Sequence, residues 1–277
     1  MSSPVERVRA VSWVLGFYAL AVAATGVAAW LLPSLHLSGR LEVFTTTPPL
    51  VLGAAFATVA VAWYRRDPAA AGWPGWRHSA RGVGVGLVAG AGMAVAALLV
   101  AVVAGARWSI PGGDVGAYLV ALVAVLAGIG LAALAEELLF RGFPLATLAR
   151  AFGPVGAVSV LSVMFALLHA RNPEVTPLGL GNILLASVVL SVAFLSRGAL
   201  TAAWGLHASW NGGLVVADAP VSGIAFDLPA VHYGGGAAWM TGASFGPEGG
   251  VAASLALGGG LVWLVSRSRG EAREAAG

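Results

Sequence analysis

Eight apolar stretches, each long enough to cross a bilayer as a helix, constrain this chain more than any other feature of its sequence. A hydrocarbon core of roughly 30 Å needs about 20 apolar residues per helix. A helix satisfies its backbone hydrogen bonds within one segment, so it is a favoured spanning structure in lipid. The expected spans are residues 11–32, 45–64, 82–105, 116–140, 153–170, 180–196, 199–217 and 250–266. The sequence therefore predicts an all-α fold, a polytopic transmembrane helical bundle of about eight helices.

The composition agrees with a membrane protein and excludes several other classes. Hydrophobic residues make up 58% of the 277 positions and charged residues only 10%, against about 25% charged in soluble domains. No basic cluster is large enough to bind nucleic acid. Without cysteine, the chain has no disulfide, no thiolate nucleophile and no cysteine zinc site. The first apolar stretch exceeds the ~7–15 residues of a signal-peptide core, so we expect it to remain as an anchor.

The arginines predict the orientation of the bundle. All 15 basic residues are arginine, and cytosolic loops carry the excess of basic residues. With a cytosolic N-terminus, twelve lie on the cytosolic side: Arg7, Arg9, Arg65, Arg66, Arg77, Arg81, Arg141, Arg150, Arg197, Arg267, Arg269 and Arg273. The other three, Arg40, Arg107 and Arg171, lie outside. We therefore expect a multi-pass protein of a bacterial cell membrane with both termini in the cytosol.

One predicted span contains three charges, in "LAALAEELLFRGF", residues 131–143. A charged side chain at mid-bilayer costs about 2.5–3.5 kcal/mol on insertion scales, so such residues usually have a function. On a helix, Arg141 lies about 40° from Glu137 and about 140° from Glu136. The sequence therefore predicts an ion pair between Glu137 and Arg141, which is as consistent with a structural role as with a functional one. Glu136 has no such local partner and is the stronger functional candidate.

Two later spans carry polar groups among apolar neighbours, "FALLH" ending at His169 and "HASWN" from His207 to Asn211. Either histidine alone is more often a satisfied core or interface residue. His207 and Asn211, however, are four residues apart and share one helix face. That spacing suits a metal pair or two donors directed at one substrate atom.

A carboxylate, two imidazoles and an amide can hydrolyse a bond with an activated water. Glu136 would take the proton of the water, and His169 would hold the same water or donate to the leaving group. His207 and Asn211 would bind the developing oxyanion. Alternatively, His169 and His207, with Glu136 or Asn211, would bind Zn²⁺, which would polarise the water and the carbonyl. The sequence leaves both mechanisms open.

These motifs carry a family resemblance. In their order along the chain, "EELLFR", "FALLH" and "HASWN" resemble the EExxxR, FxxxH and HxxxN motifs of the CPBP family. This family comprises CAAX proteases, among them the type II CAAX prenyl endopeptidase, and bacteriocin-processing intramembrane endopeptidases. The resemblance implies a metallo- or glutamate-type protease acting on a membrane-associated protein or peptide. It also implies that Glu136 is the catalytic glutamate, with Glu137, Arg141, His169, His207 and Asn211 at the other motif positions.

The resemblance covers residues 115–217, which we expect to form the catalytic core. Residues 1–114 would then supply about three N-terminal membrane helices. Residues 218–277 would supply an outer loop, the last membrane helix and a cytosolic tail. In the outer loop, "FGPEGG" is typical of a turn into a helix, and Glu248 within it is a candidate for the outer mouth of the cavity.

Two other function classes fit the same residues. In a proton-coupled transporter, Glu136, His169 and His207 would form a titrating relay, although no inverted repeat is visible in the sequence. A noncatalytic immunity or scaffold protein would keep the polar cluster for structural reasons. The replacement Glu136→Gln separates these alternatives, because glutamine has nearly the shape of glutamate and cannot accept the proton.

Overall fold

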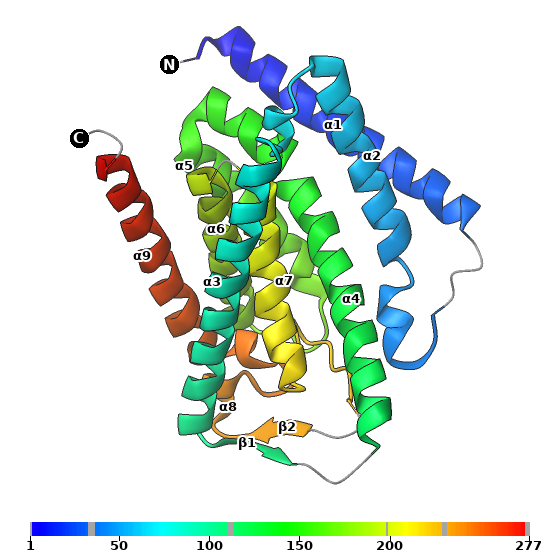
Figure 1. Cartoon of the computed structure of the whole chain (residues 1–277), viewed down its shortest axis with the longest axis vertical. Coiled ribbons are helices and arrows are strands. Elements are labelled where there is room, and N and C mark those ends of the chain that lie inside the picture. Colours follow the sequence, from blue (N-terminus) through cyan, green and yellow to red (C-terminus); the bar gives the residue numbers. More distant parts are fainter. Residues whose placement is uncertain (1, 33–36, 110–113, 198, 229–231, 275–277) are drawn as a thin grey trace.

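A computed structural model describes residues 2–32, 37–109, 114–197, 199–228 and 232–274, in which eight long helices form a bundle (Figure 1). The long helices are α1 (Pro4–Leu31), α2 (Thr47–Arg65), α3 (Trp76–Val103), α4 (Val115–Phe140), α5 (Phe143–Leu168), α6 (Pro177–Arg197), α7 (Leu200–Val216) and α9 (Val251–Glu274). Each contains or overlaps one of the eight predicted spans. The helical bundle predicted from the sequence is therefore confirmed.

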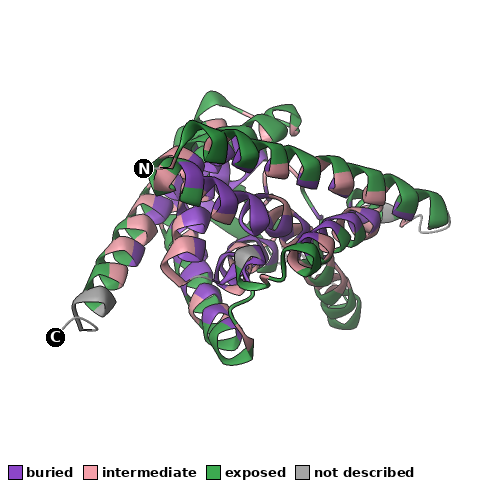
Figure 2. Cartoon of the chain, turned by 90° about the horizontal axis from the view of Figure 1, so that it is seen from above, coloured by how far each residue is buried: buried purple, intermediate pink, exposed green. Residues whose placement is uncertain are grey.

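The surface of the bundle is apolar, as lipid requires. Large hydrophobic side chains such as Val22, Trp30 and Val155 are exposed, and Figure 2 shows the exposed positions on the outward faces of the helices, around a buried interior. Among the described residues, six helical stretches are long and apolar enough to cross a membrane, one of which, Val115–Arg171, includes both α4 and α5. Helix α7 is not among them because it has only 17 residues.

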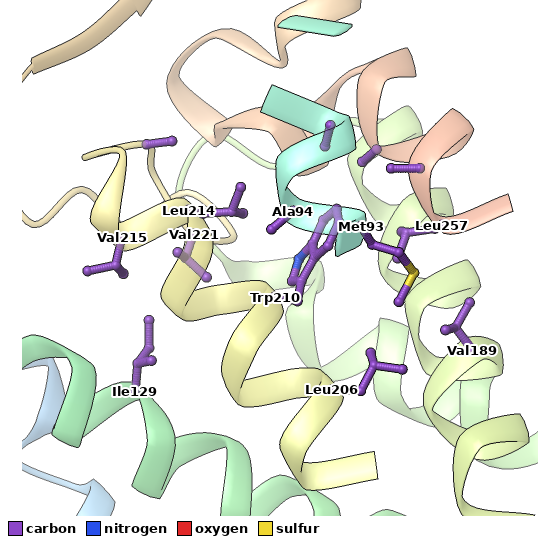
Figure 3. Close-up of a cluster of buried hydrophobic side chains, with 14 of the residues drawn as sticks. Met93, Ala94, Ile129, Val189, Leu206, Trp210, Leu214, Val215, Val221 and Leu257 are labelled. Atoms are coloured by element: carbon purple, nitrogen blue, oxygen red, sulfur yellow. The ribbon is translucent and has the colours of Figure 1, made fainter. Parts of the chain in front are cut away.

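Glycines allow α3 and α7 to pack closely. A Cβ atom on Gly90 of α3 would lie 2.1 Å from the carbonyl oxygen of Leu206 in α7, and one on Gly86 would lie 2.3 Å from that of Ala202. Figure 3 shows Trp210 and Leu206 of α7 among side chains of the neighbouring helices, including Met93 of α3. Helix α7 is therefore fixed at the centre of the bundle.

The chain breaks between α4 and α5, next to the charged motif. Helix α4 ends at Phe140, and Pro144 lies in the first turn of α5, where its missing N–H costs no helical hydrogen bond. A second break lies within α5 at Gly153, whose φ of 80° precedes Pro154.

Residues 218–228 and 232–250, the described parts of the segment predicted to be an outer loop, are folded. Strand β2 (His232–Gly235) pairs antiparallel with β1 (Ala106–Ser109), so this part of the chain adds a small sheet to the helical bundle. Helix α8 (Ala238–Thr241) and the 3-10 turns η4 (Ala243–Phe245) and η5 (Pro247–Gly249) follow. Burial raises the pKa of Asp218, and a hydrogen bond from the Leu228 amide partly opposes that rise.

The remaining 3-10 turns are η1 (Gly39–Phe44), η2 (Ala69–Ala71) and η3 (His169–Arg171). His78 and His232, two histidines outside the predicted motifs, are exposed. His36, the third, lies outside the described residues.

Candidate active site

The last turn of α4 places Glu137 and Arg141 in the bundle interior, where both side chains are almost fully buried. Arg141 Nη1 donates to Glu137 Oε1 at 3.2 Å, so the ion pair predicted from the sequence forms. Arg141 Nη2 donates to Ser187 Oγ of α6 at 2.7 Å. The guanidinium also lies over the ring of Phe165, 4.3 Å from its centroid, a cation–π geometry. The pair thus links α4 to α5 and α6.

His207 is a third member of this cluster, which the sequence did not predict. Its Nδ1 lies 2.8 Å from Glu137 Oε1, and that oxygen also accepts from Arg141. A carboxylate oxygen already held by a guanidinium is an acceptor, so Nδ1 of His207 carries a proton. Nε2 of His207 is left to face Glu136, whose Oε2 is 3.9 Å away.

Glu136 differs from Glu137 in its surroundings, as their 100° separation on the helix predicts. The Glu136 side chain is 30% exposed and that of Glu137 is fully buried. Within the described part of the chain, Glu136 Oε2 has no hydrogen-bond partner. The 3.9 Å gap to His207 exceeds hydrogen-bond distance, yet a single oxygen atom could contact both groups.

His169 lies at the end of α5, in the turn η3. Its Nδ1 is 2.8 Å from the carbonyl oxygen of Phe165, so Nδ1 donates, and Nε2 of the neutral ring keeps a lone pair. The centroid of the Phe165 ring lies 4.5 Å from the centroid of the His169 ring and 6.3 Å from that of the His207 ring. Phe165 of α5 therefore lies beside both imidazoles and beside the Arg141 guanidinium.

Four of the six predicted site residues line one cavity of about 600 Å³: Glu136, His169, His207 and Asn211. The other two, Glu137 and Arg141, lie behind its wall and do not line it. Asn211 is buried, one turn beyond His207 on α7. Among the described residues, the lining includes no arginine. The cavity therefore places a carboxylate, two imidazoles and a carboxamide around shared space.

Glu248 also lines this cavity, and its hydrogen bonds were not predicted. Its Oε1 accepts from Trp210 Nε1 at 2.8 Å, and its Oε2 accepts from the amide and hydroxyl of Ser222 at 2.6 and 2.8 Å. The Ser222 carbonyl accepts from Asn172, three residues after His169. Glu248 thus connects both histidine-bearing segments. Its place in the sequence carried only the turn signal of the surrounding glycines.

Of the predicted zinc ligands, Glu136, His169 and His207 are not placed as a three-ligand site. A catalytic zinc needs three protein ligands at about 2 Å. No group of three or more His, Asp or Glu residues is placed to hold a metal ion in the ranges that the structure describes. The hydrogen bonds of His169 and His207 occupy only Nδ1 of each ring, so Nε2 of both stays available as a ligand atom. Zinc binding by these histidines with Glu136 or Asn211 stays a prediction, and no step below depends on it.

Comparison with known families supports the resemblance in the motifs. The family model described as type II CAAX prenyl endopeptidase Rce1-like matches residues 116–213. The chain carries a CPBP-family domain. This Rce1-like domain begins at the start of α4, ends within α7 and contains all six predicted site residues. It lies inside the predicted core of residues 115–217, although the division into three parts stays a prediction. No curated protein matches the chain.

The Rce1-like domain is that of a protease family whose CAAX members act on membrane-associated proteins and are embedded in the bilayer. Helices α1 to α3, α9 and the segment containing Glu248 lie outside the match. The family match therefore gives neither the substrate nor the catalytic type of this chain, and both are proposed below from the residues of its cavity.

Proposed function

We propose that this protein is an intramembrane endopeptidase that hydrolyses a peptide bond of a membrane-associated protein or peptide with a water activated by Glu136. The observation that supports this proposal most is that Glu136, His169, His207 and Asn211 line one cavity. An enzyme of this kind must hold a base, the water and the oxyanion donors within a few ångströms of one another.

Glu136 takes a proton from the water, and the resulting hydroxide attacks the carbonyl carbon. The place of Glu136 supports this role: its side chain lines the cavity and is 30% exposed, and no other described group uses its buried Oε2 as an acceptor. His169 positions the same water: its Nδ1 is committed to the Phe165 carbonyl, so its Nε2 can accept a hydrogen bond from the water. Two acceptors then orient one nucleophile.

The developing oxyanion is stabilised by His207 and Asn211. The cluster contains the carboxylates of Glu136 and Glu137 and the guanidinium of Arg141. A second proton on His207 makes the cluster neutral overall, which lowers the cost of burying it. Nε2–H of His207 and the amide of Asn211 then donate to the oxyanion from one face of α7.

The tetrahedral intermediate collapses when the C–N bond breaks. Glu136 returns the proton it took from the water to the leaving nitrogen, so the products are a carboxylic acid and an amine and the enzyme regains its starting state. Glu137 and Arg141 do not reach the cavity. They act by fixing the tautomer and orientation of His207.

A peptide library tests this function. Purified protein in detergent is incubated with the library, and products are identified by mass spectrometry, for wild type, Glu136→Gln and the control Glu42→Gln. Glu42 is exposed in η1 and does not line the cavity. We expect cleavage by wild type and the control and none by Glu136→Gln. Equal cleavage by all three would refute the role of Glu136, and a transporter or scaffold would cleave nothing.

A further inference from the structure

The first residue of α1 and the last residue of α9 lie at the same end of the bundle, as Figure 1 shows. Eight long helices connect them, so each odd-numbered connection along the chain lies at the opposite end. In the described ranges, those connections include residues 37–46, 104–109, 169–176, and 217–228 together with 232–250. We refer to this end of the molecule as the distal face.

The connecting segments that line the catalytic cavity all belong to the distal face. Thr46, Asn172, Ser222 and Glu248 represent three of its four connections. Of the connections at the terminal end, none contributes a lining residue in the described ranges. Exposed positions on this rim include the polar Thr46 and the apolar Leu168, which is 67% exposed. The cavity therefore opens toward the distal face, with a rim suited to a peptide at the membrane surface.

Arginines indicate which compartment the distal face meets. Arg141 is buried in the site and does not contribute to the loop charge. Of the other fourteen arginines, three lie on the distal side, Arg40, Arg107 and Arg171, and eleven on the terminal side. An excess of basic residues marks the cytosolic side. The distal face therefore meets the extracytoplasmic compartment.

We propose that the cavity takes its substrate from the extracytoplasmic side, so that the substrate class is a peptide segment exposed outside the cytosol and not a cytosolic C-terminal tail. This proposal rests on the proposed function for its chemistry, and the side of access follows from the geometry and the arginine distribution. It concerns where the scissile bond is presented, which the family match leaves open.

Single cysteines measure the side of access without measuring activity. The chain contains no cysteine, so each introduced thiol is the only one present. Thr46→Cys lies on the cavity rim, and Ala69→Cys is the control, exposed in η2 between α2 and α3 at the terminal end. In intact cells, a membrane-impermeant maleimide should label the first variant and should label the second only after permeabilisation. The reverse pattern would overturn the proposal.

Sealed vesicles test substrate access itself. A membrane-impermeant peptide that the detergent-solubilised protein cleaves is added to right-side-out or inside-out vesicles. We expect cleavage in right-side-out vesicles and its loss in inside-out vesicles, with detergent restoring it. Cleavage confined to inside-out vesicles would overturn the proposal. Absence of cleavage in detergent would instead refute the proposed function, and the labelling result would still decide the orientation.

Discussion

Removing the Arg141 guanidinium should leave a buried negative charge without its main partner. In Arg141→Met, the side chain keeps a similar length but loses the ion pair to Glu137, the hydrogen bond to Ser187 Oγ and the contact with the Phe165 ring. Breaking one side of a buried ion pair costs about 3–5 kcal/mol. We expect the free energy of unfolding to fall by that amount, because Glu137 is fully buried.

A double variant separates the lost charge from the lost packing. Arg141→Met with Glu137→Gln removes both charges, and the glutamine Oε1 can still accept from His207 Nδ1. Replacing a buried ion pair by neutral groups is often close to neutral in stability. We therefore expect the double variant to be more stable than Arg141→Met alone. The control is Arg150→Met, which removes an exposed arginine of α5.

Unfolding in mixed micelles with increasing denaturing detergent, followed by tryptophan fluorescence, measures these differences. Because His207 depends on Glu137 for its orientation, Arg141→Met should also reduce cleavage. A destabilisation by Arg141→Met of less than about 1 kcal/mol, or no recovery on adding Glu137→Gln, would refute a stabilising role for this ion pair.

Two further substitutions test the surroundings of the cavity. Gly90→Ala should destabilise by about 1–3 kcal/mol through overpacking, since its Cβ would meet the α7 backbone, and it should reduce cleavage by moving His207. Unfolding in micelles measures the first effect, with Gly92→Ala as control because that position has open space. Glu248→Gln should cost about 1–3 kcal/mol, since the glutamine NH₂ would face the N–H of either Trp210 or Ser222 and leave that donor unsatisfied.

A different result would contradict each of these two predictions. Equal stabilities for the two glycine variants would show that α3 and α7 separate freely. Wild-type stability in Glu248→Gln would show that the carboxylate does not hold the Ser222 segment against α7.

The bundle was predictable because each span must be apolar and about as long as the bilayer is thick. The interaction between Glu137 and Arg141 was predictable for a similar reason, since residues four apart on a helix share one face. By contrast, helix periodicity could not bring Glu136 and His169 together, because α4 ends at Phe140 and α5 breaks again at Gly153 between them. Both side chains nevertheless line one cavity.

Contacts between distant segments were not predictable. Glu137 lies 70 positions from His207 and Glu248 lies 38 positions from Trp210, and no local periodicity connects such pairs. The burial of residues 245–250 was missed because glycine and proline indicate a turn without indicating whether it is exposed. Tertiary packing alone decides these features.

The most direct test of the central claim is the cleavage rate of Glu136→Gln in metal-free conditions. Wild type and Glu136→Gln are purified, treated with a chelator and compared on a peptide that the wild type cleaves. We predict that the chelated wild type keeps its rate and that Glu136→Gln loses about 10²–10⁴-fold or more, the usual contribution of a general base. Loss of wild-type activity on chelation, restored by zinc, would contradict the metal-independent route, and a fully active Glu136→Gln would contradict the account as a whole.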